Sequence, residues 1–394
     1  MQRNHNTSLP NQMPIPSPDA FQHSTQLLAH IFSEINRDGG KISFAKYMDL
    51  ALYTPGLGYY SGGMQKFGVQ GDFVTAPELS TLFSKCLASQ CQEILENLGG
   101  GDILEVGAGS GQMAADILLA LTKANTLPNY YYILELSADL KKRQQEKIAT
   151  LCPAFFNRVI WLETLSLFDF KGIILANEVL DAMPVHQFQI HQSILHEVEV
   201  TAQDGKLQYQ MSPTNNPRLL AHSHSQTWPT EYTSEINLHL KPWIMSLSDI
   251  LKSGVILIID YGFPQHEYYH PQRSMGTLMC HYRHYAHHDP FLYPGLQDIT
   301  AHVDFTAIAE AASDVALDVL GYTSQAAFLF DTGLMTLAEQ YNATTDKETL
   351  IRNHAIQTLT SPAEMGELFK VIALGRNFEE TLMGFKLTDR RYTL

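Results

Sequence analysis

The chain has little positive charge and no long apolar run. Its 394 residues carry 26 lysines and arginines against 41 aspartates and glutamates, which gives a formal net charge of −15. Few cations are available to neutralise phosphates, so nucleic acid is disfavoured as a partner and a basic partner is favoured. The longest apolar runs, such as Val255 to Ile259, are too short to span a bilayer, so we expect a soluble protein without a membrane partner.

Cysteine is also scarce, with 4 residues and no CxxC spacing. Reduced thiols in a cytoplasmic protein are the simplest account of this pattern. The first 20 residues are rich in proline, asparagine, glutamine and serine and carry one arginine, unlike a secretory signal or an arginine-rich transit peptide. We therefore expect a disordered tail over residues 1–22 and a cytoplasmic location, with the mitochondrial matrix as the alternative.

Residues 23–100 show the periodicity of helices. Ser24 and Ser43 each precede a segment with apolar residues at helical spacing, and Thr75 precedes a longer one that ends at the glycines of residues 99–101. Because this region has no strand pattern, we expect a helical cap rather than a domain with its own sheet.

From residue 101 to 394, short apolar segments alternate with helical ones, which is typical of a parallel α/β sheet covered on both faces. We expect strands at 102–106, 131–136, 158–161, 172–177, 255–261, 318–330 and 369–375, and helices at about 111–123, 138–150, 231–252 and 304–315. Two insertions follow the fourth and fifth strands, a β-hairpin at about 185–211 and a lid-like irregular loop at about 262–303. The result is a seven-stranded sheet in one domain.

The first expected strand runs into glycines at alternate positions, Gly107, Gly109 and Gly111. Their backbone can turn tightly against a ligand, and the helix that follows points its free N–H groups at the loop. A dinucleotide loop has the form GxGxxG, but Gln112 occupies the position of its last glycine. The shorter GxGxG form, with Glu105 just before it, suits S-adenosylmethionine (SAM), which carries no phosphate. The loop alone favours SAM and leaves NAD open.

Glu135 ends the second expected strand, about two dozen residues beyond the glycine loop. A carboxylate at this position accepts the two ribose hydroxyls of an adenosine cofactor. It fits NAD and SAM equally, so it indicates a nucleoside without separating them. The alternative is a surface glutamate at a strand end.

Asn177, Glu178 and Asp181 follow the fourth expected strand, and Pro184 ends their turn. Ligands of open α/β sheets bind beyond the carboxyl ends of the strands. Two carboxylates at this edge would pair with the fork of donors of a guanidinium and align one nitrogen with a methyl donor. A dehydrogenase has no evident use for the pair. In the alternative reading, Glu178 caps the following turn and Asp181 is solvated.

Residues 71–78 form a third candidate, in which Asp72 and Thr75 precede the start of a helix. Free N–H groups and carboxylates at a helix start can contact a cofactor that lies beneath it, so both residues are candidates for cofactor binding. Glu78, three residues after Thr75, also fits a capping box, and the two roles are compatible.

Several histidines gather in the expected loop, together with tyrosines and Arg283. Their spacing does not place them on one helix face, and there is no HExxH motif, so we expect histidine and aromatic packing and no metal. The residues are His281, His284, His287, His288 and His302. A Ser–His–Asp hydrolase is not supported either, because no GxSxG motif is present.

These segments together resemble the MidA-type family of SAM-dependent methyltransferases, whose mitochondrial members are protein arginine methyltransferases that act in complex I assembly. The resemblance extends from about Ile42 to the C-terminus and is carried by residues 71–78, 104–111, 177–184, 260–262, 276–278, 294–295 and 298–305.

The resemblance implies a class I (Rossmann-like) methyltransferase fold, SAM as methyl donor and a protein arginine as acceptor. The glycine loop and Glu135 match the family's cofactor-binding positions, and Asn177, Glu178 and Asp181 match its strand-four motif. Two departures stand out: Ala108 replaces a frequent proline, and residues 279–282 replace a more basic run. The second departure bears on the acceptor site.

The sequence thus predicts a methyltransferase in which Glu178 and Asp181 bind the arginine side chain of a protein, such as a respiratory complex subunit. Methylation of a small molecule or a carboxylate is the alternative within enzymes. A SAM-binding assembly chaperone is the alternative from another class, and a nicotinamide oxidoreductase is a further alternative. The number of methyl groups and the oligomeric state, including a homodimer, stay open.

Overall fold

The computed structural model describes residues 13–62, 75–165, 168–224, 228–340 and 345–394. The chain divides into two compact units, each assembled from three segments. Unit 1 comprises residues 1–73, 184–236 and 277–301, and unit 2 comprises residues 74–183, 237–276 and 302–394. No helix among the described residues is both long and apolar enough to cross a bilayer. The four cysteines are free and buried.

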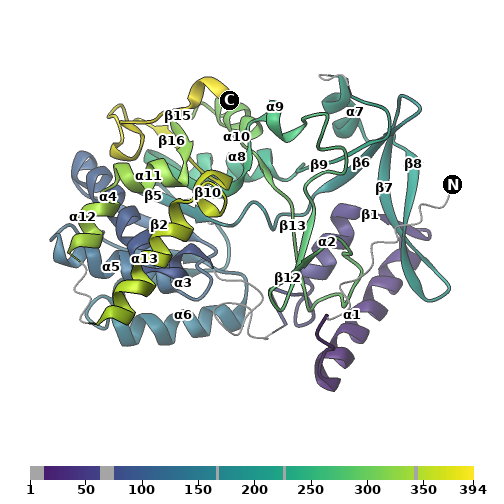
Figure 1. The fold of residues 1–394 in the computed structure, drawn as a ribbon, viewed down its shortest axis with the longest axis horizontal. Helices are drawn as coiled ribbons and strands as arrows, with labels where there is room; N and C mark the ends of the chain where they lie inside the picture. Colours follow the sequence, from purple (N-terminus) through teal and green to yellow (C-terminus); the bar gives the residue numbers. More distant parts are fainter. Residues whose placement is uncertain (1–12, 63–74, 166–167, 225–227, 341–344) are drawn as a thin grey trace. The chain divides into compact units, whose positions relative to one another are not determined.

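Unit 2 contains the main sheet, which has eight strands among the described residues (Figure 1). Seven of them lie in the order β15-β16-β10-β5-β2-β3-β4, and β14 pairs with the end of β10. Among these described strands, β16 runs antiparallel to both β10 and β15, and the other pairs are parallel. The strands are β2 (Asp102–Val106), β3 (Tyr131–Leu134), β4 (Val159–Leu162), β5 (Phe170–Asn177), β10 (Leu251–Phe263), β14 (Val303–Asp304), β15 (Asp318–Ser324) and β16 (Phe369–Arg376).

Helices cover both faces of this sheet because successive strand residues face opposite sides. On β5, Ile173 and Leu175 join one buried cluster, whereas Ile174 and Ala176 join another. The first cluster includes apolar residues of α4 (Thr81–Leu98), α5 (Gln112–Lys123), α6 (Ala138–Leu151), α11 (Gln325–Asp331), α12 (Leu334–Glu339) and α13 (Asp346–Thr360). The second includes those of α8 (Leu240–Ile250) and α10 (Phe305–Asp314). The unit is therefore a three-layer α/β/α sandwich. The carboxyl ends of its parallel strands lie at the same edge of the sheet.

Unit 1 has a sheet of its own, five-stranded among the described residues, in which β8 pairs with β7 beside the path β1-β7-β6-β9. All pairs are antiparallel. The strands are β1 (Lys41–Ser43), β6 (His186–His191), β7 (Ile194–Gln203), β8 (Lys206–Pro213) and β9 (Tyr232–Ile236). A small sheet of β11 (Met279–Tyr282), β12 (Tyr285–His287) and β13 (Asp298–Thr300) and helices α1 (Pro18–Arg37), α2 (Phe44–Tyr53) and α7 (Pro217–His224) complete the unit.

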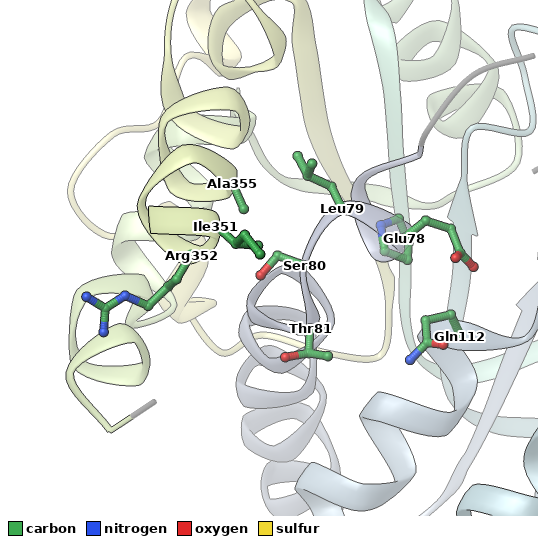
Figure 2. A pocket seen from close by; sticks show the side chains of 9 residues that line it. Glu78, Leu79, Ser80, Thr81, Gln112, Ile351, Arg352 and Ala355 are labelled. Atoms are coloured by element: carbon green, nitrogen blue, oxygen red, sulfur yellow. The ribbon is translucent and has the colours of Figure 1, made fainter. Parts of the chain in front are cut away.

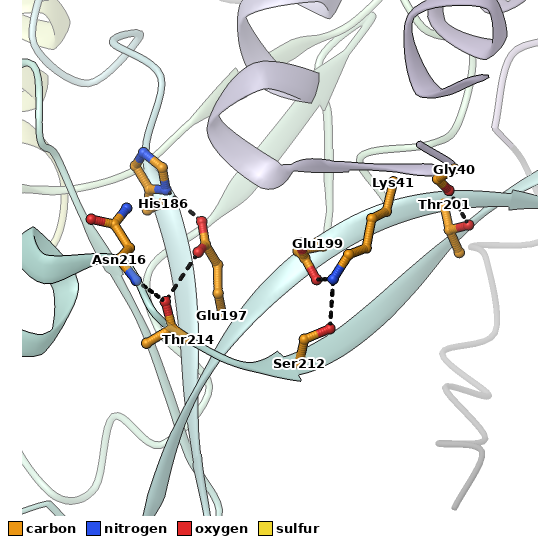
Figure 3. A network of polar contacts seen from close by, with 9 residues as sticks. All are labelled: Gly40, Lys41, His186, Glu197, Glu199, Thr201, Ser212, Thr214 and Asn216. Atoms are coloured by element: carbon orange, nitrogen blue, oxygen red, sulfur yellow. Dashed lines mark hydrogen bonds and ion pairs between the residues drawn. The ribbon is translucent and has the colours of Figure 1, made fainter. Parts of the chain in front are cut away.

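Polar side chains connect β1 to strands that are far away in the sequence (Figure 3). Lys41 donates to Glu199 Oε2 over 2.7 Å and to Ser212 Oγ over 3.0 Å. Thr201 donates its hydroxyl to the carbonyl of Gly40 over 2.8 Å. Lys41 and Glu199 are 158 residues apart in the chain. Strand β1 can therefore pair with β7 only after the second segment of unit 1 has been synthesised.

The expected division into a tail, a helical cap and one large domain differs from this arrangement. Residues 1–12 lie outside the described residues, and α1 begins at Pro18, capped by Ser17 instead of Ser24. Residues 41–43 form β1, which pairs with β7. The region 23–100 is therefore shared between the two units. Periodicity within one segment cannot show a pairing with a distant strand, which explains the difference.

Other boundaries also differ from the expectations. The helix expected after Thr75 is interrupted at Ser80, whose extended backbone separates α3 (Ala76–Leu79) from α4. Residues 232–236 form β9 ahead of α8, instead of the start of a helix, because all five are buried in a sheet. The late strand expected at 318–330 ends at Ser324, which caps α11 by accepting a bond from the N–H of Ala327.

Both expected insertions contain more regular structure than the sequence suggests. The hairpin at 185–211 becomes β6, β7 and β8, which extend to Pro213 and pair further with β1 and β9. The loop at 262–303 contains the end of β10, α9 (Gln265–Tyr268) and strands β11 to β13. These strands have only three or four residues each, so neither a helical nor a strand period is visible in the sequence.

Candidate functional site

The glycine loop connects β2 to α5 in unit 2. Gly107, Gly109 and Gly111 have φ values of 69°, 50° and 80°, a left-handed backbone that favours glycine. A β-carbon on Gly111 would lie 3.1 Å from the Cα of Gln144, so α6 packs directly on the loop. Gly111 is also the N-cap of α5, where it supplies no side chain to the free N–H groups. The loop therefore presents its main chain at a helix start, where Ser110 Oγ accepts the N–H of Gln112 over 3.3 Å.

Glu135 follows β3 beside this loop. Its Oε1 accepts the N–H of Ser137 over 2.9 Å, and its Oε2 accepts the side-chain amide of Gln144 over 2.8 Å. The same amide also donates to the carbonyl of Gly109 over 3.0 Å, and Trp161 donates to the Gln144 Oε1 over 3.0 Å. Gln144 is fully buried, so its position is fixed. One side chain, which the sequence analysis did not single out, thus holds both the loop and the carboxylate.

Glu105 lies in a different environment from the glycines. Only 1% of the residue is exposed, and the hydroxyl of Tyr131 donates to its Oε2 over 2.6 Å. Burial raises the pKa of Glu105 to about 7, opposed by the hydrogen bond from Tyr131 and reinforced by the nearby Glu135. Its carboxyl group is therefore bonded to Tyr131 inside the sheet and is not exposed at the glycine loop.

The turn after β5 brings together the residues expected to bind the acceptor. We call Asn177–Asp181 the acidic turn. The N–H of Glu178, whose φ is 52°, donates to the carbonyl of Ile259 over 2.9 Å. Asn177 donates its side-chain amide to Glu178 Oε1 over 3.2 Å. Asp181 is 5% exposed and accepts the hydroxyl of Tyr261 on Oδ2 over 2.6 Å. Burial raises the pKa of Asp181 to about 6, against the effects of the Tyr261 hydrogen bond and of the nearby backbone N–H groups of Ala182 and Asp181.

Two oxygen atoms of the acidic turn have no hydrogen-bond partner among the described residues. They are the buried Asn177 Oδ1 and Asp181 Oδ1. A buried acceptor that lacks a donor costs about 1–3 kcal/mol, so proteins seldom leave two of them together. Both atoms accept hydrogen bonds, and a ligand with N–H groups would satisfy them. The alternative in which Asp181 is solvated does not fit its burial.

Asp260, at the carboxyl end of β10, was missed as a site residue. It is fully buried, and its Oδ2 accepts the N–H groups of Val179, Leu180 and Asp181 over 3.2, 2.9 and 3.3 Å. Burial raises the pKa of Asp260 well above its usual range, with Asp181 and Glu178 adding to the effect. Neighbouring parallel strands end at the same edge, so an aspartate there was the signal available in the sequence.

The third candidate segment is only partly described. Asp72 lies outside the described residues, and Thr75 makes no side-chain capping bond within them, so the expected capping box is wrong. The side chain of Glu78 points to the glycine loop, where it accepts the hydroxyl of Ser110 and lies 3.5 Å from Lys147 Nζ. Glu78 therefore ties α3 to the loop.

A cavity of about 230 Å³ lies beside Glu78 and Gln112, between the start of α4 and helix α13 (Figure 2). Small-molecule sites usually have about 300–1,000 Å³. Figure 2 shows the Arg352 side chain directed away from the other labelled side chains, and its guanidinium donates to the carbonyl of Ala338 over 3.2 Å. The cavity is therefore small, and the cation among the described residues that line it is bound to the main chain of α12.

The histidines of the expected loop are divided between the units. In unit 2, His302 packs against Tyr261 and Phe263 with ring centroids 5.2 Å apart in both pairs. Burial, followed by the charges of Arg273 and Lys370, lowers the pKa of His302 to about 4. Within the described ranges, no group of three or more histidine, cysteine, aspartate or glutamate residues could hold a metal ion.

Comparison with known proteins gives consistent results. The sequence pattern of a family of S-adenosyl-L-methionine-dependent methyltransferases matches residues 86–323. A structure from Burkholderia thailandensis, bound to S-adenosyl-homocysteine, is 43% identical and covers 97% of this chain and 100% of its own, with a TM-score of 0.94. The α/β methyltransferase fold and its mixed central sheet are therefore shared.

Two animal proteins are similar over most of the chain. The protein arginine methyltransferase NDUFAF7 of Danio rerio is 28% identical over 88% of this chain and 86% of its own length. The human protein of the same name is 28% identical over 89% and 83%. Both are named as mitochondrial proteins, so they give no support to the cytoplasmic location expected from the sequence.

Proposed function

Because the chain belongs to this family of S-adenosyl-L-methionine-dependent methyltransferases, we propose that it methylates a guanidinium nitrogen of an arginine in a protein partner. The unpartnered acceptors of the acidic turn carry the proposal. Related proteins named as protein arginine methyltransferases support it. The resemblance to the MidA-type family suggests a subunit of a respiratory complex as the partner.

The residues of unit 2 fit SAM as the cofactor. The glycine loop brings main chain without β-carbons to the start of α5, and Glu135 offers a fixed carboxylate for the ribose hydroxyls. When bound, SAM supplies an electrophilic methyl carbon on a good leaving group. The protein therefore has to orient the acceptor and exclude water, and needs little covalent chemistry of its own.

The acidic turn fits a guanidinium better than other acceptors. A guanidinium has five N–H donors and a positive charge. Asn177 Oδ1, Asp181 Oδ1 and the Glu178 carboxylate offer acceptors and negative charge in one turn of chain. A carboxylate substrate would be repelled by Glu178 and Asp181, which disfavours the alternative of carboxylate methylation.

The reaction also requires the release of a proton. A bond forms between the guanidinium nitrogen and the methyl carbon as the carbon–sulfur bond breaks, and the nitrogen then loses one proton to restore the charge of the guanidinium. The buried carboxylate of Asp181 is a suitable acceptor because its pKa of about 6 lies close to neutral pH.

Labelling with SAM tests the proposal. Cell extract is incubated with the purified protein and SAM labelled on the methyl group, and the products are identified by mass spectrometry. We expect label on methylarginine in protein. Label on lysine or on small molecules alone would overturn the arginine assignment. If Asp181→Asn abolished labelling yet restored the phenotype of a knockout strain, the assembly-chaperone alternative would replace it.

A further inference from the structure

We infer that Asp260 and Tyr261 are positioning residues that hold the acidic turn in the shape that receives the acceptor. The inference rests on the proposed role of Glu178 and Asp181. Asp260 and Tyr261 come from β10, the strand next to the one that carries the acidic turn. They act on it in two ways, one through the main chain and one through a side chain.

The main chain of the acidic turn is anchored to the end of β10. Glu178 donates its N–H to the carbonyl of Ile259, and the three N–H groups that follow converge on Asp260 Oδ2. Four consecutive N–H groups are thus bound to one strand end. This anchoring stabilises the left-handed backbone of Glu178, which costs a residue with a side chain about 1–2 kcal/mol.

Asp260 already uses both carboxyl oxygens for hydrogen bonds within the protein. It is fully buried, and its other oxygen, Oδ1, accepts the N–H of Tyr261 over 2.9 Å. Among the described residues, both oxygens of Asp260 therefore accept hydrogen bonds from backbone N–H groups. All four N–H groups donate to its two oxygens, so a carboxyl group suits this position better than an amide, whose NH2 group only donates.

Tyr261 selects which oxygen of Asp181 faces the acceptor. Its hydroxyl occupies Oδ2, and Oδ1 is left without a partner among the described residues. The Tyr261 ring is held edge-on by His302, at 5.2 Å and 88°, and by Phe369, at 5.3 Å and 64°. The hydroxyl is thus supported by a rigid ring, which fixes the rotamer of Asp181.

Substitution at both positions, with a matched control, tests the inference. Asp260→Asn keeps the size of the side chain but replaces one of its two oxygens with an NH2 group. This group donates and cannot accept the backbone N–H groups that it faces. Tyr261→Phe removes the hydroxyl alone. Asp304→Asn is the control, because Asp304 is another buried carboxylate of unit 2 and caps α10 by accepting the N–H groups of Thr306 and Ala307.

The measurements are the initial rate of label transfer from SAM into protein at increasing SAM concentration and the affinity for S-adenosylhomocysteine. We expect the maximal rate to fall about 30-fold in Asp260→Asn and about 10-fold in Tyr261→Phe. The KM for SAM and the affinity for S-adenosylhomocysteine should stay within twofold of wild type. Asp304→Asn should lower the melting temperature and keep the rate.

Each result supports or contradicts the inference. Wild-type rates in Tyr261→Phe, or losses in Asp260→Asn that Asp304→Asn reproduces, would overturn it. If Asp260→Asn fails to fold, Tyr261→Phe still decides. The wild-type protein reports separately on the proposed function: label that never reaches arginine contradicts that function, whereas arginine labelling unaffected by Tyr261→Phe contradicts the positioning role alone.

Discussion

Gln144 donates its side-chain amide to Glu135 Oε2 over 2.8 Å and to the carbonyl of Gly109 over 3.0 Å. The first contact fixes the carboxylate proposed to bind ribose, and the second fixes the loop proposed to lie against the rest of the cofactor. A single buried amide on α6 therefore sets the spacing between two parts of the proposed cofactor site.

Replacement of this amide should weaken cofactor binding. We expect Gln144→Ala to lower the affinity for S-adenosylhomocysteine about 10-fold, because each lost hydrogen bond contributes roughly 0.5–1.5 kcal/mol and Glu135 becomes free to move. Isothermal titration calorimetry measures the change. Gln92→Ala serves as control, since Gln92 donates to Glu96 on the exposed side of α4. An unchanged affinity in Gln144→Ala would show that the loop and the carboxylate are held independently.

Removal of the carboxylate itself should have a larger effect. We expect Glu135→Ala to lower the affinity for S-adenosylhomocysteine about tenfold to a hundredfold, since a hydrogen bond to a charged group contributes roughly 1.5–3 kcal/mol. Glu163→Ala is the matched control, because Glu163 follows the next strand and 82% of its side chain is exposed. Equal affinities for wild type and Glu135→Ala would refute the assignment.

The methylation rate should depend on the charge of Asp181. Its pKa is about 6, and only the ionised form binds a guanidinium and accepts its proton. We therefore expect the rate at saturating SAM to rise as the pH increases from 5 to 7. Asp181→Asn should lose at least about 100-fold in rate while its affinity for S-adenosylhomocysteine stays near wild type. A rate that is flat between pH 5 and 8 would contradict this role.

The stability of the fold should depend on the protonation of Glu105. Its folded pKa of about 7 lies above its ordinary value of 4.5, so the folded state favours the neutral form. The resulting stabilisation is complete below about pH 4.5 and is lost as the pH rises to about 7. By linkage, the loss is on the order of 3 kcal/mol. Glu105→Gln keeps an oxygen for Tyr131 and cannot ionise.

Urea unfolding at pH 5 and pH 8 measures this difference. We expect Glu105→Gln to lose less stability between the two pH values than the wild type. Other buried carboxyl groups, such as Asp304 with a pKa of about 7, contribute a similar slope to both proteins and cancel in the comparison. Parallel pH dependence in the two proteins would place the ionisation of Glu105 outside this range.

The sheet of unit 2 could be predicted from the sequence because its strands are locally distinctive. Strand β2 has the expected bounds of residues 102–106, and β4 and β5 begin within two residues of the expected positions. Strands buried on both faces are continuous apolar runs, and glycines mark the turn that follows β2. Such signals lie within one segment of chain and need no knowledge of distant partners.

Unit 1 and the support of the acidic turn depend on contacts between distant segments. Lys41 and Glu199 are 158 residues apart, and no pattern around either residue predicts their pairing. Asp260 is 80 residues from Leu180, whose N–H it accepts. The residues proposed to meet the acceptor could be found from their chemistry and their place at a strand end. Asp260 also stands at a strand end, but its hydrogen bonds to the acidic turn are visible only in the folded structure.

The division of both units into three segments also constrains how the nascent chain folds on the ribosome. At roughly 5–20 residues per second, synthesis takes about 15–60 seconds to progress from the first residues to the end of the last unit 1 segment, near residue 301. Throughout that interval β1 lacks its partner strand or the unit lacks β11 to β13. The apolar residues of α1 and α2 that pack in one cluster with Val200 of β7 and Ile299 of β13 therefore lack those partners during that interval.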